Sequence, residues 1–301
     1  MTYPVNAGVP SLSGTFIPEI WTSKLITKFY DMTVFGAIAN TDYEGEIQKF
    51  GDTVNIRQRP DITIRNYVKG TALTYENPDE VIKQLLIDQG KYFAFNVFDI
   101  DKTQSDIALM NEWSTDGGEQ LKIEIDKSIL ATIYTGADAS NAGATAGRIS
   151  GDVNLGTTAA PLALSKANII DKIIEAGQVL DENNIPEDRF IVLPASMCTR
   201  IKTSELKDAS VSGDGTSMLR NGKVGKLDRF TIYQSNNVNV TSGRYDIIFG
   251  HKCATTFAAQ LTKMESMKNP NDFGDLVRSL MVYGFEVVKG SALGRMVATN
   301  A

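Results

Sequence analysis

The sequence predicts a mixed α+β protein, and three observations lead to this fold class. Apolar and polar residues alternate with a period of two in residues 48–99, which indicates strands, and the C-terminal tail is typical of two strands separated by turn residues. Apolar residues at i, i+4 spacing predict helices, the longest of them over residues 105–134. Strands and helices do not follow one another in strict alternation, which argues against a Rossmann sheet or an α/β barrel.

The composition narrows the class of protein further. The chain has 301 residues, with 42% hydrophobic and 22% charged residues, as in ordinary globular proteins. A net charge of -6 argues against a dedicated nucleic-acid binder. Two cysteines, Cys198 and Cys253, are too few for a disulfide framework and suit a reducing compartment. We expect no signal peptide and no membrane span, because no apolar run is long enough.

The first elements form an arm followed by an extended excursion. The opening residues are rich in Pro, Gly, Ser and Asn, which favours an irregular arm, and a helix is predicted over 18–30. Residues 48–99 then resemble a long two-stranded ribbon. The alternating apolar positions of this ribbon are Val54, Ile56, Ile62, Ile64, Leu85, Ile87, Phe93, Phe95 and Val97. A two-stranded ribbon is marginal alone, so we expect it to pack on another element or another copy.

The longest helix is predicted over 105–134, with its apolar stripe at every fourth residue. Gly117 and Gly118 each cost about 1 kcal/mol relative to alanine inside a helix, and we interpret them as a bend. The members of the stripe are Leu121, Ile125, Ile129 and Ile133.

In the second half of the chain, short helices and strands are predicted in irregular order. A helix is expected over 165–182 with Ser165 as its N-cap, then a strand over 190–193. Ser196 is expected to cap a short helix over 197–206. Strands follow at 229–234 and 245–250, and the C-terminal region predicts two more strands.

No catalytic, cofactor-binding or metal-ligating residue is predicted. Ser196 lacks the flanking glycines of a nucleophile elbow, and the chain has one histidine, His251. The segment around Lys223 lacks two required positions of a phosphate-binding loop. One histidine and two distant cysteines do not make a usual zinc site. Paired carboxylates stay open, so a hydrolase-like enzyme with a carboxylate site is an alternative.

A basic cluster on the ribbon is the strongest charged feature. It has two interpretations: a solvated strand face, or a set of intersubunit salt-bridge donors with weak contact to nucleic acid. Its members are Arg57, Arg59, Arg65 and Lys69.

Several segments, in this order, resemble the major capsid proteins of tailed bacteriophages, which have the Hong Kong 97-type fold. They are "GDTVNIRQRP", "VLDENNIPEDRFIVLPASM", "NGKVGKLDRFTIYQSNNV", "IIFGHKCATTFAAQLTKMES" and "YGFEVVKGSALGRMVA". The combination of "IIFGHKCATTFAAQLTKMES" followed by "FGDLVRSLMVYGFEVV" resembles the branch whose coat proteins assemble with a separate scaffolding protein. The resemblance covers nearly the whole chain.

The resemblance implies a division of the chain into four parts. Residues 1–47 would be an N-terminal arm and 48–91 an extended β-ribbon loop lying over a neighbouring subunit. Residues 92–140 and 255–285 would form a peripheral domain with the spine helix 105–134. Residues 141–254 and 286–301 would form the axial domain. Gly117 and Gly118 would match the place where the family's spine helix bends.

The resemblance also implies function and partners. The chain would be a structural capsid protein, not an enzyme, that assembles as pentamers and hexamers into an icosahedral shell around double-stranded DNA. Its partners would be a scaffolding protein, a portal protein at one vertex, an optional decoration protein, and DNA held by non-specific contacts. The protein would occupy the host cytoplasm before assembly and then the virion. An encapsulin-like compartment is a further alternative, and no cofactor is expected.

Overall fold

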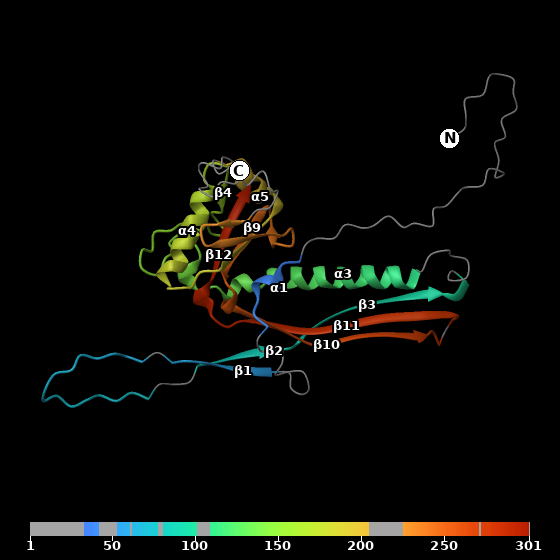
Figure 1. The fold of residues 1–301 in the computed structure, drawn as a ribbon, viewed down its shortest axis with the longest axis horizontal. Helices are drawn as coiled ribbons and strands as arrows, with labels where there is room; N and C mark the ends of the chain where they lie inside the picture. Colours follow the sequence, from blue (N-terminus) through green and yellow to red (C-terminus); the bar gives the residue numbers. More distant parts are fainter. Residues whose placement is uncertain are drawn as a thin grey trace, which may run out of the picture.

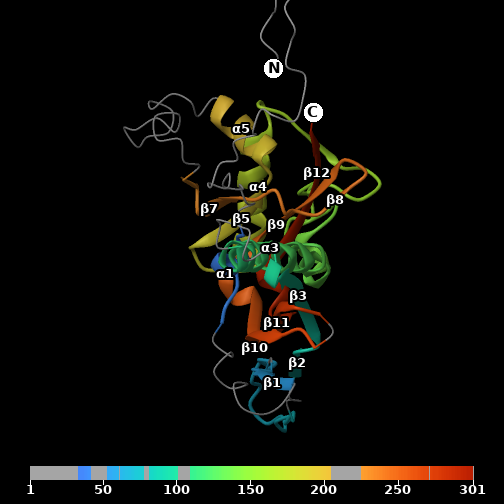
Figure 2. The same ribbon diagram turned by 90° about the vertical axis from the view of Figure 1, so that its right-hand side faces the viewer.

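Two sheets are joined by one long helix in the computed structural model. The structure describes residues 33–41, 53–60, 62–77, 81–100, 109–204, 225–270 and 272–300. The larger sheet lies above the helix and the smaller sheet below it, with a hairpin and an extended loop beneath (Figures 1 and 2). The expected helix over 18–30 lies outside the described residues. The mixed α+β fold class is confirmed.

The lower unit is a three-stranded antiparallel sheet with the long helix on one face. Strand order is β10-β11-β3, and the helix is α3. The hairpin β1–β2 is a separate two-stranded sheet, and the short helix α1 precedes it. The bounds are α1 Phe35–Ile38, β1 Thr53–Gln58, β2 Val81–Leu86, β3 Gln89–Phe98, α3 Leu109–Leu130, β10 Thr255–Lys268 and β11 Gly274–Val287.

The upper unit is a seven-stranded mixed sheet. Its order is β4-β12-β9-β5-β7-β6, with β8 paired to β9. The pairs β12–β4 and β5–β7 are parallel, and the other pairs are antiparallel. The strands are β4 Leu162–Leu164, β5 Arg189–Leu193, β6 Lys226–Leu227, β7 Phe230–Gln234, β8 Val240–Thr241, β9 Arg244–His251 and β12 Leu293–Asn300. The helices are α4 Ile169–Glu182 and α5 Ala195–Thr203, and the 3-10 turns are η2 Ile133–Gly136, η3 Ala139–Asn141, η5 Lys252–Ala254 and η6 Gly290–Ala292.

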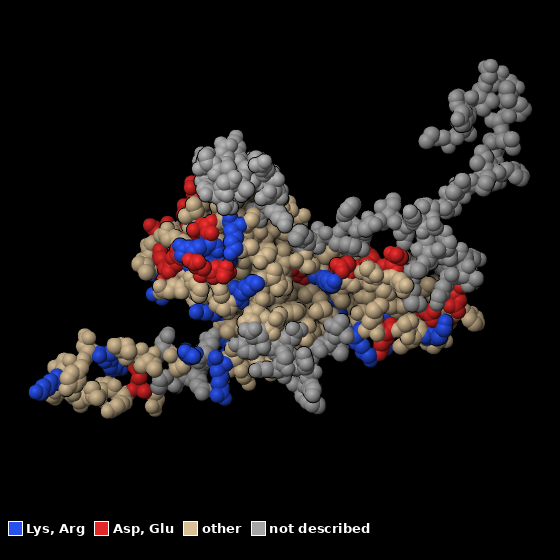
Figure 3. All heavy atoms as spheres, in the orientation of Figure 1, with Lys and Arg blue, Asp and Glu red and all other residues tan. Residues whose placement is uncertain are grey.

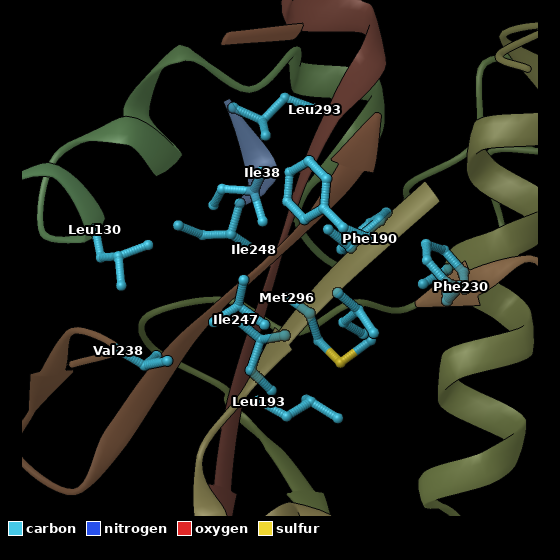
Figure 4. Close-up of a cluster of buried hydrophobic side chains, with 14 of the residues drawn as sticks. Ile38, Leu130, Phe190, Leu193, Phe230, Val238, Ile247, Ile248, Leu293 and Met296 are labelled. Carbon is cyan, nitrogen blue, oxygen red and sulfur yellow. The ribbon is translucent and has the colours of Figure 1, made fainter. Parts of the chain in front are cut away.

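The main core lies on both faces of the seven-stranded sheet. Every residue of β5 is buried, which explains the continuous apolar run from Phe190 to Leu193 in the sequence. On one face, Phe230 and Phe249 meet edge to face with ring centroids 6.2 Å apart, within the range of about 4.5–7 Å typical of aromatic pairs. Ile38 from α1 and Leu130 from α3 point to the other face near Ile248 (Figure 4). The end of the long helix is therefore part of the upper core.

A buried guanidinium joins α4 to β5. The side chain of Arg189 is 1% exposed and donates to the carbonyls of Gly177 and Pro186, both at 3.0 Å. It also donates to Asp181 at 2.7 Å. Arg229 binds the two oxygens of the same Asp181 carboxylate at 2.8 and 2.6 Å. One carboxylate thus binds two arginines, and Arg189 satisfies carbonyls near the C-terminal end of α4.

The loop before β4 is tied to α4 by one carboxylate. Glu182 accepts hydrogen bonds from the Ser150 hydroxyl at 2.7 Å and from the backbone N–H groups of Ile149 and Ser150 at 2.7 and 3.1 Å. These bonds, with the Ser150 hydroxyl as the largest contribution, lower the pKa of Glu182 from 4.5 to about 2.

This anchor makes the loop pH-dependent. The folded pKa of Glu182 lies below its unfolded value, so its stabilising contribution is present above about pH 4.5 and is lost as the pH falls towards 2. We expect amide exchange at residues 147–151, corrected for intrinsic rates, to accelerate over that interval. Glu182→Gln should show weak protection at every pH. Equal protection at both ends of the interval would contradict this role.

Four sequence-based expectations need correction. Residues 48–99 are not one ribbon, because β3 pairs with β11 and only β1 and β2 form the hairpin. Ser196 is not an N-cap, since Pro194 holds that position and α5 begins at Ala195. The helix expected from Ser165 begins at Ile169 after a turn closed by Asn168. The long helix stops at Leu130, where the chain turns and continues as η2.

Candidate assembly surfaces

The base of the extended loop is fixed on the three-stranded sheet. β1 and β2 pair from Thr53↔Leu86 to Gln58↔Val81. The hairpin buries one face against Ala258 of β10, as the period of two predicts, and the alternate residues face outward. Gly284 of β11 makes this contact possible, because a Cβ there would overlap the carbonyl oxygen of Leu86. The buried members of the hairpin and its return are Val54, Ile56, Leu85 and Ile87.

Beyond its base, the loop is not covered by any other segment that the structure describes. Every residue of 62–77 is exposed, and the segment forms no strand. Ile64 is 91% exposed, Tyr75 86% and Tyr67 74%. The loop extends away from both sheets (Figure 1). Such a concentration of exposed apolar side chains is typical of a surface that binds another protein.

The four basic residues of the ribbon lie along this hairpin and loop. Arg57 and Arg59 are exposed at the end of β1, and Lys69 is exposed at the far turn. Arg65 pairs with Glu76 at 3.5 Å, and Glu76 also accepts from the backbone N–H of Thr63 at 2.7 Å. Positive side chains therefore dominate the loop (Figure 3). The structure places the four on one projection, with Arg65 bound inside it.

The long helix packs on β3 through aromatic side chains. Phe93 and Phe95 stack with ring centroids 6.2 Å apart, and Trp113 meets Phe95 edge to face at 5.7 Å. Gly117 brings the helix close, because a Cβ there would lie 3.0 Å from the Phe93 ring. A Cβ at Gly118 would meet nothing within 4 Å. α3 is a continuous helix across both glycines.

On the opposite face of the three-stranded sheet, no described segment of the chain covers the strands. Tyr92 is 76% exposed there, and a hollow of about 520 Å³ lies beside it. Glu265 receives hydrogen bonds from Lys263 and, at 2.6 Å, from Arg278, and these contacts lower its pKa. The face thus carries the exposed ring of Tyr92 beside a cluster of charged side chains, Lys263, Glu265 and Arg278.

A buried carboxylate joins three distant segments. Asp126 of α3 is 2% exposed and accepts from the backbone N–H groups of Val34 and Phe35 at 3.1 and 2.9 Å. Its other oxygen accepts from the side-chain amide of Asn237, beyond β7, at 2.8 Å. The start of α1, the long helix and the loop of the upper sheet therefore meet at one side chain.

Comparison with known proteins decides the family. The model of the phage capsid protein family matches residues 82–292, which is most of the chain. The chain belongs to the phage capsid protein family. It therefore forms part of a capsid shell, and its role is structural. No curated protein matches the sequence.

Solved structures of phage capsid proteins are similar over nearly the whole length. The chain is 28% identical to a structure of Mycobacterium phage Che8, covering 93% of this chain and 96% of that one, with a TM-score of 0.78. The capsid of cyanophage P-SCSP1u gives 16% identity, 99% coverage of both chains and a TM-score of 0.73. The mature capsid of bacteriophage PhiM1 gives 15%, full coverage of both and 0.68. These similarities agree with the Hong Kong 97-type fold.

The cysteines and the histidine have surroundings typical of structural residues in this capsid protein. Burial raises the pKa of the Cys198 thiol to about 11, so it is a neutral thiol at neutral pH. Burial lowers the pKa of His251, whose Nδ1 accepts from the Cys253 backbone N–H at 3.2 Å. Within the described residues, no three His, Cys, Asp or Glu side chains gather as a metal site. No described helix is long and apolar enough to cross a membrane.

The sequence reasoning missed Asp126. Asp126 lies beside the apolar stripe of the long helix, next to Ile125 in the sequence. A second row of buried residues, Ile123 and Leu130, runs beside that stripe, and Asp126 lies between them at i+3 and i−4. A carboxylate inside an apolar row is a detectable signal of a buried hydrogen-bonded group.

Proposed function

We propose that copies of this capsid protein assemble as pentamers and hexamers into an icosahedral shell that encloses double-stranded DNA. The observation that carries the proposal is the extended loop: its base is fixed on the three-stranded sheet, while residues 62–77 expose apolar side chains. Within a shell, each copy has other copies of the same chain as its neighbours, so a second copy is the expected partner of the loop. Burying this loop against it would supply interface area that one chain lacks.

The division of the chain supports this arrangement. We assign 1–47 to an arm, 48–91 to the extended loop, 92–140 and 255–285 to a peripheral domain, and 141–254 and 286–301 to an axial domain. The three-stranded sheet with α3 supports the peripheral assignment, and the seven-stranded sheet supports the axial one. Of the arm, the structure describes 33–41.

The partners beyond other copies follow from the same proposal. A separate scaffolding protein directs assembly, a portal protein occupies one vertex, and a decoration protein is an optional addition. DNA is held by non-specific contacts, and the chain occupies the host cytoplasm before assembly. The chain acts as a structural protein, without enzymatic activity.

Charge reversal on the loop tests the proposed intersubunit contacts. We propose that Arg57, Arg59, Arg65 and Lys69 donate to acidic groups of a neighbouring copy. The chain is expressed with its scaffolding protein, and particles are counted by electron microscopy. Arg57→Glu with Arg59→Glu should lower the particle yield about tenfold or more, as expected for like charges facing each other. Lys166→Glu, an exposed reversal on the other unit, should leave the yield unchanged.

The outcomes distinguish failure of the proposed salt bridges from failure of the proposed shell assembly. Equal particle yields from the arginine variant and the Lys166 variant would show that these arginines form a solvated face. The proposed shell assembly would not be contradicted by that result. If the unaltered chain gave monomers or dimers and no particles with its scaffold, the proposed assembly would be wrong.

Gly118 is proposed as the place where the long helix changes curvature between immature and mature shells. Alanine at position 118 has open space and should stabilise the helix by about 1 kcal/mol. At position 117 the same change presses on Phe93. We expect amide protection near these glycines to differ between the two shells, and Gly118→Ala to reduce the difference. Ser114→Ala, on the same helix, is the control. Identical protection in both shells would count against a bend here.

A further inference from the structure

A hollow of about 320 Å³ lies on the face of the seven-stranded sheet opposite α4. Its strand residues include Arg244 and Asp246 of β9 and Arg295 of β12. Asp246 pairs with Val297, another lining residue, so both strands present this face together. Phe249 points to the opposite face, where it packs with Phe230 beside α4.

Two guanidinium groups meet in this hollow. Arg244 donates through Nη1 to the backbone carbonyl of Thr158, and Arg295 reaches the hydroxyl of the same residue at 3.5 Å. Arg244 also donates through Nε to the carbonyl of Thr241 at 3.2 Å. Two positive groups converging on one residue repel each other unless negative charge lies between or beside them.

The negative charge at the site is half of what the arginines require. Of the described residues that line the hollow, Asp246 is the one carboxylate. It takes both the Nε and Nη2 donors of Arg295, at 3.0 and 2.7 Å, and its other oxygen accepts from Asn239 at 2.6 Å. Arg244 donates to two neutral carbonyls, those of Thr241 and Thr158. The lining therefore carries a net charge of one positive unit.

The arginines are also held in position before any ligand arrives. The Arg295 guanidinium lies 4.3 Å from the centre of the Tyr134 ring, and its ion pair with Asp246 fixes its plane. That ion pair uses the Nε and Nη2 donors, which leaves the Nη1 edge of the fork for another acceptor. The hydroxyls of Thr158 and Thr241 add donors at the same rim. Fixed donors lower the entropic cost of binding.

We propose that this hollow is a binding site for a phosphate oxyanion. Guanidinium groups match the geometry and charge of phosphate, and a phosphate has enough oxygens to receive both arginines and the threonine hydroxyls. The source is either free inorganic phosphate or a phosphodiester of the enclosed nucleic acid. The second source rests on the proposed function, and the first does not.

The test is calorimetric titration of the purified full chain, as capsomers or shells, at constant ionic strength. One arm uses inorganic phosphate and the other a short DNA duplex, each against chloride. Arg244→Gln should raise the dissociation constant for phosphate about tenfold or more, as expected for loss of a charged hydrogen-bond donor. Arg278→Gln is the control, because it removes the same charge from an arginine bound to Glu265 on the other sheet.

Each outcome decides the matter. Phosphate binding that Arg244→Gln weakens and Arg278→Gln leaves intact supports the site, and DNA binding with the same pattern identifies the phosphodiester as the source. If Arg244→Gln does not fold, as judged by circular dichroism, Thr241→Val replaces it and should weaken binding by a smaller factor. Equal binding in native and Arg244→Gln chains overturns the proposal. So does weak phosphate binding together with loss of self-association in Arg244→Gln, which would identify a carboxylate of a second copy as the occupant. Particle formation, counted separately, reports on the proposed function.

Discussion

Replacing Asp181 by asparagine is expected to lower the free energy of unfolding by about 3 kcal/mol, at the lower end of the range for breaking a buried ion pair. The carboxylate is partly exposed, with 35% of its side chain accessible, but Arg189 is 1% exposed. Without Asp181, the Arg189 guanidinium stays buried with neutral carbonyls as its remaining partners. Arg229 loses both of its short contacts. Urea denaturation of the unassembled chain measures the change.

The neighbouring Asp228 offers a matched control for this substitution. Its contact with Arg229 is 3.9 Å, and its side chain is 38% exposed. Asp228→Asn makes the same change in charge at nearly the same place and should alter stability by less than about 1 kcal/mol, as for exposed pairs. Similar losses from both variants would show that net charge, and not the buried guanidinium, sets the effect.

Replacing Gly284 by alanine is expected to detach the hairpin β1–β2 from the three-stranded sheet. The new Cβ would overlap the carbonyl of Leu86, and backbone atoms on both sides cannot turn away as a flexible side chain does. Overpacking of this kind costs about 1–3 kcal/mol. Because this hairpin carries the extended loop, shell formation should fall much more than the stability of the upper sheet. Amide exchange in β1 and β2, and particle counts, measure the two effects.

Gly90 is the control for that change. It lies on β3 of the same sheet, and a Cβ there would meet its nearest neighbour, a Leu280 methyl group, at an ordinary 3.9 Å. Gly90→Ala should leave both the hairpin and the particle count unchanged. Normal protection of β1 and β2 in Gly284→Ala would contradict the proposed role of close backbone approach.

The sequence predicted the strands and helices well where one face of an element is buried and the other exposed. The alternation at Val54 and Ile56 and the stripe through Ile125 and Ile129 are both present in the structure. Strand pairing was harder to predict, because apolar alternation in β3 does not indicate whether its partner is β2 or β11. That choice depends on contacts with residues almost 200 positions away in the chain. Local composition also misplaced the cap at Ser196, since Pro194 already has the extended backbone of an N-cap.

The surfaces were harder to predict than the fold. The basic residues Arg57 and Arg59 stood out in the sequence, but the glycine that admits the hairpin, Gly284, is one of 25 glycines with no local mark. The convergence of Arg244 and Arg295 depends on the register of β9 with β12 and on a loop that reaches them through Thr158. Such sites arise from tertiary structure and leave no short motif.

The hydrogen bonds of Asp126 have a mechanical consequence. Because one carboxylate holds the backbone at Val34 and Phe35 and also the amide of Asn237, tension applied to the backbone at the start of α1 is shared with the upper sheet. A tilt of the upper sheet would likewise strain the hydrogen bonds to the carboxylate oxygens of Asp126. Any relative movement of α1 and the upper sheet would therefore stretch or break the hydrogen bonds to this single buried carboxylate.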